Sequence, residues 1–325
     1  MLLYTLAVMA GFGLLIVGAD RCVMGASATA RNFGVSPLVI GLTIVGFGTS
    51  APELLISAMA AFGGNPGLAI GNALGSNITN IALVLGVAAL IAPLTVQSET
   101  LRREFPLLLA VSIFAFLLMN DGVLGRLDGV LMLVALAGMM YLVITLGLRA
   151  READRDPMAQ EFADEMPKPM STSAALFWSV LGIVLLLSGS QVLVWGSVGI
   201  AEAFGVSDLI IGLTIVAIGT SMPELMATVV SALKREHDIA LGNIIGSNMF
   251  NTLGVLGLPG VIFPSAFAPE VLTRDLPWML GLTIGLFIMA YGFRGPGRLN
   301  RVEGGILLVA YIVYMLMLYW AATRV

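Results

Sequence analysis

Two glutamates lie deep inside apolar stretches of this sequence, where a charged side chain is costly. Glu53 occurs in GFGTSAPELL at residues 46–55, and Glu224 occurs in AIGTSMPELM at residues 217–226. A carboxylate at the centre of a membrane span costs about 2.5–3.5 kcal/mol on insertion scales. No Lys or Arg lies at a comparable depth in these stretches. We therefore expect a bound cation to be the partner of both glutamates.

The neighbours of each glutamate add neutral oxygen ligands. Residues four positions apart share one face of a helix. At that spacing, each stretch places a carboxylate between two hydroxyls: Thr49, Glu53 and Ser57, then Thr220, Glu224 and Thr228. Pro52 and Pro223 have no N–H, so the carbonyls of Gly48 and Gly219 lose their helical donors. The sequence thus predicts two broken helices that offer carboxylate, hydroxyl and carbonyl oxygens.

A second pair of segments supplies amides. GNALGSNITN at residues 71–80 and GNIIGSNMFN at residues 242–251 place polar residues four positions apart on one face: Asn72, Ser76 and Asn80, then Asn243, Ser247 and Asn251. Carboxylate, amide, hydroxyl and carbonyl oxygens suit Ca²⁺, Mg²⁺ or Na⁺ rather than soft transition metals. Together the four segments predict one cation cage with a formal charge of about −2, from its two carboxylates.

A structural explanation competes with this one. A single Asn or Ser in a membrane helix usually joins neighbouring helices by hydrogen bonds, and a single buried Glu is ambiguous. Here all these features occur twice, at one offset of 171 residues without a gap. The repetition favours function for Glu53 and Glu224, whereas a purely structural role stays open for Asn72 and Asn243.

The elements that position these residues must be membrane helices. The chain has 325 residues, of which 58% are hydrophobic and 11% are charged. Soluble proteins carry about 25% charged residues, so a soluble fold is excluded. The apolar runs are continuous rather than alternating, which predicts an all-α polytopic membrane protein and not a β-barrel.

Charged and Pro/Gly clusters divide the chain into ten expected spans. They lie near residues 2–30, 36–62, 68–93, 104–120, 127–148, 173–202, 208–233, 239–262, 276–293 and 303–321. We expect an N-terminal five-helix repeat (1–148), a cytoplasmic linker (149–171) and a C-terminal five-helix repeat (172–325). Because five is odd, the second repeat enters the membrane from the opposite side. Helices 2 and 7 are then the broken helices, and the inverted repeats place a site between them.

The loops indicate an orientation. With the N-terminus external, the predicted cytoplasmic segments hold twelve Lys and Arg residues and the external segments hold three. The positive-inside rule then predicts a multi-pass protein of the plasma (inner) membrane, with both termini external and the linker cytoplasmic.

Other chemistries find little support. Cys22 and His237 are the only residues of their kinds, so Cys-based metal sites, paired-His sites and Ser/His or Cys/His nucleophiles are excluded. We expect no enzyme and no resident cofactor, since Ca²⁺ and Na⁺ would be transported. No basic block indicates nucleic acid, and no protein partner besides the lipid bilayer is implied.

At these motifs the sequence resembles the Ca²⁺/cation antiporter superfamily, and above all its prokaryotic Na⁺/Ca²⁺ exchanger-like members. GTSxPE followed by GNxxGSN, present twice, matches the two repeats of that family. The resemblance implies that Glu53 and Glu224 are central carboxylates shared by Ca²⁺ and Na⁺. It implies further ion contacts at Thr49, Thr220, Ser50, Ser221, Ser76, Ser247, Asn80, Asn251, Gly46 and Ala217.

One departure from the family pattern leaves the ion stoichiometry and any competition by protons open. Some archaeal relatives have Asp where this chain has Asn251, so the cage here has two carboxylates rather than three. The proton-coupled branch of the superfamily has a different repeat signature, which this chain lacks.

The resulting hypothesis is Ca²⁺ export driven by inward Na⁺ through alternating access. One alternative is an antiporter of the same fold that couples to H⁺ or K⁺, or that moves another divalent ion such as Mg²⁺ or Mn²⁺. A cation channel is the alternative from a different class. Inverted halves favour alternating access over a channel, since channel subunits usually repeat about the membrane normal.

Overall fold

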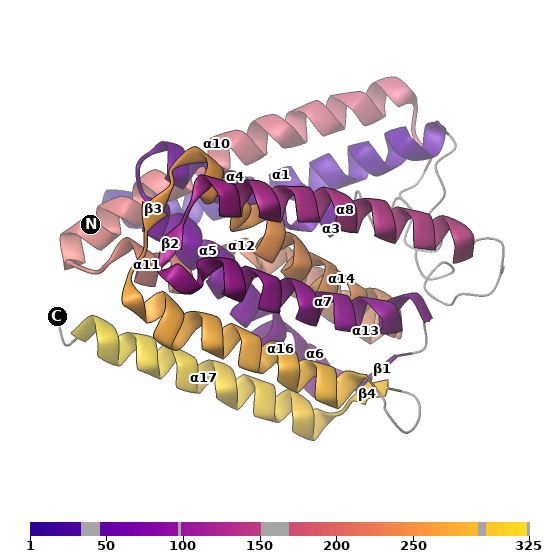
Figure 1. The fold of residues 1–325 in the computed structure, drawn as a ribbon. Coiled ribbons are helices and arrows are strands. Elements are labelled where there is room, and N and C mark those ends of the chain that lie inside the picture. The colour runs from indigo at the N-terminus through magenta and orange to yellow at the C-terminus, as the bar shows by residue number, and fades with distance from the viewer. Residues whose placement is uncertain (34–45, 97–98, 151–168, 292–296, 324–325) are drawn as a thin grey trace.

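The computed structural model describes residues 1–33, 46–96, 99–150, 169–291 and 297–323. These residues form an elongated bundle that is almost entirely helical (Figure 1). Long apolar segments favour helices because a helix satisfies its own backbone hydrogen bonds where water is absent. The predicted all-α membrane architecture is confirmed at this level.

The N-terminal half begins with one long helix and continues through shorter pieces. Its elements are α1 (Leu2–Asn32), α3 (Gly46–Thr49), α4 (Ala51–Phe62), α5 (Pro66–Ile78), the π-helix η2 (Thr79–Val84), α6 (Leu85–Ile91), β1 (Leu94–Val96), α7 (Glu99–Leu118), the 3-10 turn η3 (Met119–Asp121), β2 (Val123–Leu124) and α8 (Arg126–Ala150).

The C-terminal half presents a similar order of elements. They are α10 (Thr172–Phe204), α11 (Asp208–Ile211), the π-helix η5 (Gly212–Val216), α12 (Ala217–Thr220), α13 (Met222–Lys234), α14 (His237–Phe250), the π-helix η6 (Asn251–Val255), α15 (Gly257–Ile262), β3 (Ser265–Ala266), the π-helix η7 (Val271–Asp275), α16 (Leu276–Ala290), β4 (Gly297–Leu299) and α17 (Arg301–Thr323).

The described residues contain seven helices long and apolar enough to cross a membrane, or eight if the bent pair Asp208–Thr220 and Met222–Lys234 counts as one span. The count of ten spans is therefore not confirmed and stays a prediction. Residues 36–45 of the second expected span lie outside the described residues. Most of the expected linker lies outside them as well, since residues 151–168 are not described.

Short antiparallel strands join the two halves. β1 pairs with β4, with Leu94 opposite Leu299, and β2 pairs with β3, with Leu124 opposite Ser265. Each pair therefore takes one strand from each half. These strands were not predicted from the sequence. Their pairing links the ends of the two halves.

α1 and α10 lie side by side as a long antiparallel pair along one edge of the bundle (Figure 1). Glycines at intervals of seven residues let the two backbones approach, and these are Gly11, Gly18 and Gly25 in α1 and Gly182, Gly189 and Gly196 in α10. A Cβ at Gly189, for example, would lie 2.9 Å from Cβ of Leu14. Small residues allow such close packing in membranes, where no hydrophobic force drives helices together.

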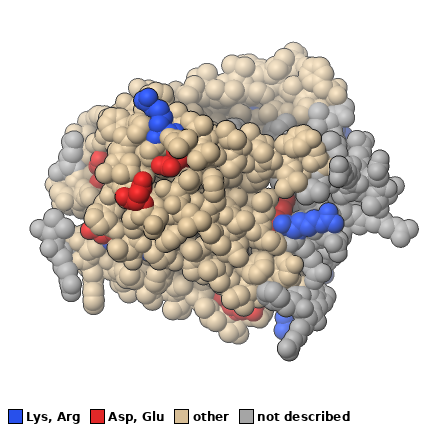
Figure 2. Space-filling view, viewed as in Figure 1, with Lys and Arg blue, Asp and Glu red and all other residues tan. Residues whose placement is uncertain are grey.

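The spans Pro66–Ile91 and His237–Ile262 are mostly buried, whereas less than half of each other candidate span is buried. Figure 2 shows a broad uncharged surface on which the few charged side chains gather mainly toward the two ends. Large apolar side chains are exposed along the outer helices, among them Val134, Val309 and Leu316. This surface suits a hydrocarbon environment, and it leaves the two central spans to carry buried polar groups.

The ends of the chain are arranged as the topology prediction requires. α1 begins and α17 ends at one end of the bundle, whereas α8 ends and α10 begins at the other (Figure 1). The end at which Met170 leads into α10 is called the linker end below. Which end faces the cytoplasm stays a prediction from the loop charges.

Candidate cation site

The site is built around two helix breaks that resemble each other closely. The first falls at Ser50, between α3 and α4, where φ and ψ are −86° and 3°. The second falls at Ser221, between α12 and α13, where φ and ψ are −80° and 5°. There the helix axis bends by 43°. Pro52 and Pro223 each stand two residues after the break, at a position where a helix tolerates proline.

Glu224 follows the second break and is fully buried. Its Oε1 accepts hydrogen bonds from the hydroxyls of Ser50 and Ser247, each at 3.4 Å. Its Oε2 has no hydrogen-bond partner. The carboxylate is thus held by one hydroxyl from each half and keeps one oxygen free for a ligand.

Glu53 follows the first break and is also fully buried. Neither of its carboxylate oxygens has a hydrogen-bond partner. The hydroxyls of Thr220 and Ser221 lie beside it, and Glu224 is near enough to repel it electrostatically. A buried carboxylate without partners is strongly unfavourable, so this arrangement calls for a positive ligand between the two glutamates.

Each glutamate lies against the helix break of the opposite half. Glu53 of the first half faces Thr220 and Ser221 at the break of the second half. Glu224 of the second half faces Thr49 and Ser50 at the break of the first. Hydroxyls of the opposite half therefore lie beside each carboxylate, and the site exists only where the two halves meet.

Asn72 and Asn243 join the halves in the same reciprocal way. Asn72 donates to the backbone carbonyl of Glu53 at 3.0 Å and accepts from the hydroxyl of Thr220 at 3.3 Å. Asn243 donates to Thr228 at 3.2 Å and accepts from Thr49 at 3.4 Å. These amides already have protein partners, as the structural explanation for them requires.

Ser76, Asn80 and Asn251 are fully buried in the two central spans. The hydroxyl of Ser76 lies 3.3 Å from that of Thr220. Asn80 donates to Asn248 at 3.0 Å, and its Oδ1 has no partner. Asn251 is fully buried, and neither its Oδ1 nor its Nδ2 has a partner.

The helices α5 and α14 each continue into a π-helix beside the cation site. η2 starts at Thr79, one residue before Asn80, and η6 starts at Asn251 itself. Single π-turns inside helices occur frequently at functional sites. The sequence pattern did not predict them, because π-turns have no simple periodic signal.

The remaining expected contacts involve the backbone and lie at the starts of the short helices. Ala217 begins α12, and its carbonyl accepts from the hydroxyl of Thr220 at 3.3 Å. Gly46 begins α3. Ser221 is buried and its hydroxyl has no partner. All fourteen expected site residues thus belong to the elements at or next to the two breaks.

The expected ligand set omitted Asn77 and Asn248, which occupy equivalent positions in the two GSN motifs. Asn77 donates to Thr252 at 2.8 Å, and Asn248 donates to the backbone carbonyl of Asn77 at 3.3 Å. Both are buried. The sequence signal that could have identified them is their recurrence at the 171-residue offset. The pairing itself depends on how α5 and α14 approach each other.

The donor set fits a hard cation. Unpartnered oxygens come from the carboxylates of Glu53 and Glu224, the amides of Asn80 and Asn251 and the hydroxyl of Ser221. Hard cations such as Ca²⁺ and Na⁺ take oxygen ligands of these kinds. Within the described part of the chain, no group of three or more His, Cys, Asp or Glu side chains could hold a metal ion. Two carboxylates therefore supply the negative charge of the site.

Comparison with known sequences identifies the family of the chain. The profile of the family described as sodium/calcium exchanger protein matches residues 3–145 and 174–320. The chain belongs to this family. It is a family of transporters, and the expected membership of the Ca²⁺/cation antiporter superfamily is confirmed. The matched ranges fall on either side of the expected linker.

Relatives and a solved structure extend over nearly the whole exchanger chain. A protein of Alkalimonas amylolytica assigned as antiporter CaxA is 49% identical over 319 residues, which are 98% of this chain and 99% of the relative. A structure of the sodium-calcium exchanger NCX_Mj, soaked with Na⁺ and Ca²⁺, is similar with a TM-score of 0.67. It is 32% identical and covers 97% of this chain and 98% of its own.

Two other relatives bear on location and coupling. The inner membrane protein YrbG of Escherichia coli is 40% identical over 98% of both chains. The Ca²⁺/H⁺ antiporter ChaA of Bacillus subtilis is 27% identical over 89% of this chain and 86% of its own. The family therefore supports antiport of Ca²⁺ against a second cation, and its members differ in that second cation.

Proposed function

We propose that this chain exchanges Ca²⁺ for Na⁺ across the plasma membrane by alternating access. One observation carries the proposal. Glu53 and Glu224 are fully buried at the junction of the two halves, and three of their four carboxylate oxygens have no hydrogen-bond partner. A site with these oxygens is complete only when it holds one or more cations.

The charge of the site accounts for exchange. A cage of about −2 is costly to close off from water when it is empty, because two desolvated carboxylates repel each other. One Ca²⁺ neutralises the cage, and so do Na⁺ ions bound at the same oxygens. Since both ions require Glu53 and Glu224, they cannot bind together, and only a loaded carrier changes its access readily.

Neutral ligands would surround the two glutamates. We assign further ion contacts to hydroxyls, amides and backbone carbonyls of the breaks and of the two buried spans: Thr49, Thr220, Ser50, Ser221, Ser76, Ser247, Asn80, Asn251, Asn72, Asn243, Gly46 and Ala217. The free amide of Asn251 supports direct ligation, whereas the bonded amides of Asn72 and Asn243 support a role in holding the halves in register.

Recurring elements support two inverted five-helix repeats, residues 1–148 and 172–325, joined by the linker 149–171. Three kinds of element occur in the same order in both halves. They are the breaks at Ser50 and Ser221, the π-helices η2 and η6, and the short strands, which are β1 and β2 in the first half and β3 and β4 in the second. Ten spans would place the linker in the cytoplasm and both termini outside, as the loop charges predict. No resident cofactor, catalytic step, nucleic acid or obligatory protein partner is part of the proposal.

Coupling to H⁺ is the second candidate, and the similarity to the Ca²⁺/H⁺ antiporter ChaA favours it. Buried carboxylates can carry protons as well as metal ions, so Glu53 and Glu224 would serve that function too. K⁺ coupling and transport of Mg²⁺ or Mn²⁺ would use the same oxygens. A channel would need a continuous path, whereas the glutamates are closed off by protein on all sides.

The test is uptake of ⁴⁵Ca²⁺ into proteoliposomes that contain the purified chain. Uptake should follow an outward Na⁺ gradient, saturate with Ca²⁺ and stop when the Na⁺ gradient is dissipated. A pH gradient or a K⁺ gradient of equal size should not replace it. Uptake driven by the pH gradient alone would favour the H⁺-coupled alternative, and uptake that needs no gradient exchange would contradict antiport.

A further inference from the structure

A cavity of about 600 Å³ lies beside the site, toward the linker end of the bundle. It lies between α1 and the second broken helix, where Val23 of α1 faces Pro223 and Met226. Thr49 and Met170 also line it. Because the hydroxyl of Thr49 donates to Asn243, the cavity extends to a residue of the cation site.

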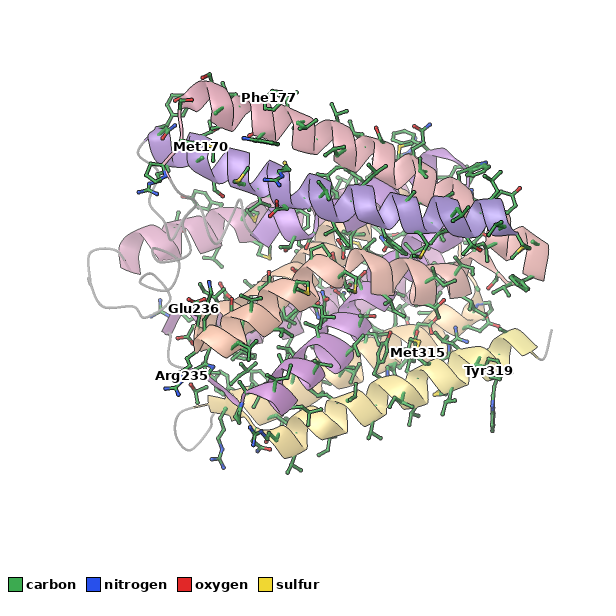
Figure 3. All side chains as sticks on the ribbon, turned by 180° about the vertical axis from the view of Figure 1, so that it is seen from behind. Met170, Phe177, Arg235, Glu236, Met315 and Tyr319 are labelled. Carbon is green, nitrogen blue, oxygen red and sulfur yellow. The ribbon has the colours of Figure 1, made fainter. Side chains whose placement is uncertain are left out.

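The surroundings of this cavity can be followed in Figure 3 through Met170, which lines it. In Figure 3, Met170 lies at the end of the α1–α10 pair, and Arg235 and Glu236, which follow α13, lie toward the same end of the bundle. Met315 and Tyr319 of α17 lie toward the opposite end. The cavity therefore runs from the linker end toward the middle of the bundle.

Among the described residues that line this cavity, Asp20 is the only ionisable one. Its side chain is 67% exposed although it lies in the middle of the apolar span Leu2–Asn32. Ionisable residues inside membrane spans almost always face a water-filled cavity, a partner or a transport path. The cavity explains how Asp20 can stay charged at this depth.

The neighbouring arginine does not neutralise Asp20 fully. Nε of Arg21 lies 3.6 Å from Oδ2 of Asp20, in a pair that is largely exposed. The guanidinium of Arg21 also lies over the ring of Trp178 in α10, 4.9 Å from its centroid. An exposed pair of this kind is weak, so Asp20 keeps most of its attraction for a passing cation.

The repeat partner of Asp20 offers a contrast inside the same molecule. Gln191 occupies the equivalent position in α10 and lines a second cavity of about 390 Å³, together with Tyr4, Met59 and Asn65. None of the described residues that line this second cavity belongs to the cation site. The two cavities therefore differ in charge, and the charged one has a residue of the site, Thr49, in its lining.

We propose that Asp20 is a cation-recruiting residue of the access path at the linker end, an inference that rests on the proposed antiport. A carboxylate beside a cavity with low-dielectric walls raises the local cation concentration and the rate of ion entry. Asp20 binds no ion in the occluded site. It lowers the KM for cations that enter from the linker end and leaves the KM at the opposite face unchanged.

The experiment measures ⁴⁵Ca²⁺ transport from each face separately, in right-side-out and inverted vesicles. A tag after α17 identifies the face opposite the linker end. We expect Asp20→Asn to raise the KM for Ca²⁺ at the linker end by on the order of tenfold, with an unchanged maximal rate. The difference should shrink in high choline chloride, since salt screens the attraction. Asp20→Glu should behave as the wild type, and Gln191→Asn serves as the matched control.

A thiol variant keeps the test independent of how well Asp20→Asn folds. Cys22 is the single native cysteine, so Asp20→Cys in a Cys22→Ser background carries one thiol. A negatively charged thiosulfonate applied at the linker end should restore a low KM, and a positively charged one should raise it further. Neither reagent should act from the opposite face.

Three results would overturn the inference: an equal rise of the KM at both faces, a fall of the maximal rate with an unchanged KM, or no change at either face. Failure of the proposed function is a distinct result. In that case the wild-type chain itself would show no Na⁺-dependent Ca²⁺ exchange. A wild type that exchanges, with an Asp20→Asn variant that is indistinguishable from it, refutes the recruiting role alone.

Discussion

The hydroxyl of Ser50 donates a 3.4 Å hydrogen bond to Oε1 of Glu224, although 174 residues separate them in the sequence. Ser50 is the break residue of the first half, and Glu224 follows the break of the second. The bond makes the geometry of each carboxylate depend on the other half. A movement of one half against the other would therefore change the cation site directly.

Removing one of the buried charges should separate function from stability. Because the glutamates repel each other and three of their four carboxylate oxygens lack partners, Glu53→Gln should abolish Ca²⁺ transport and raise the melting temperature of the ion-free protein. Differential scanning fluorimetry and ⁴⁵Ca²⁺ flux measure the two effects. Glu270→Gln, at an exposed position, serves as the control and should change neither. A large loss of stability in Glu53→Gln would mean that the carboxylate has a structural partner.

The hydroxyls that hold Glu224 should matter for affinity. Ser247→Ala deletes one of the two donors to Oε1. A hydrogen bond to a charged group is worth about 1.5–3 kcal/mol, so the apparent affinity for Ca²⁺ should fall by about 10-fold to 100-fold. Ser112→Ala is the matched control, since Ser112 is buried but donates only to the carbonyl of Leu108 in its own helix. Equal Ca²⁺ affinities in the two variants would argue against the assigned role of Ser247.

The amide pair that joins the two buried spans should contribute to stability. Asn248 accepts from Asn80 and donates to the carbonyl of Asn77. Asn248→Ala leaves these buried groups without a partner, and we expect a loss of about 1–3 kcal/mol, seen as a lower melting temperature. Asn65→Ala is the control, since Asn65 is only part-buried and its side chain donates to the carbonyl of Gly63 two residues away. An unchanged melting temperature would show that the pair adds no net stability.

The close approach of α1 and α10 gives a further prediction. A side chain at Gly189 would collide with Leu14 and with the carbonyl of Gly11. Gly189→Leu should therefore force the two helices apart and destabilise the protein by about 1–3 kcal/mol or more. At Gly138 in α8 an added Cβ meets nothing within 4 Å, so Gly138→Leu is the matched control. Comparable melting temperatures for the two variants would contradict the packing described for α1 and α10.

Much of the site could be predicted from sequence because its signals are local and repeated. Proline two residues after Ser50 and Ser221 predicts the breaks, and a carboxylate in an apolar run predicts a ligand. The same features at one offset predict that two halves build one site. The long helices of the structure lie close to the expected spans, because a membrane helix has a continuous apolar stretch that can be recognised in the sequence.

The rest depends on how distant segments approach one another. No local pattern shows that Asn248 would bond to Asn77, or that each threonine at a break would face the glutamate of the other half. The π-helices at Asn80 and Asn251 break the periodicity that sequence analysis uses. Asp20 stands next to Arg21 in the sequence, which offers it a partner, and only the cavity beside it favours a role in ion entry.

The central claim is that Na⁺ and Ca²⁺ compete for the same two buried carboxylates. Isothermal titration of the purified chain with Ca²⁺, at increasing Na⁺, tests it most directly. The account predicts saturable Ca²⁺ binding that weakens steadily as Na⁺ rises and is absent in both Glu53→Gln and Glu224→Gln, while Glu270→Gln binds as the wild type. Ca²⁺ binding that is independent of Na⁺, or that survives either substitution, would contradict it.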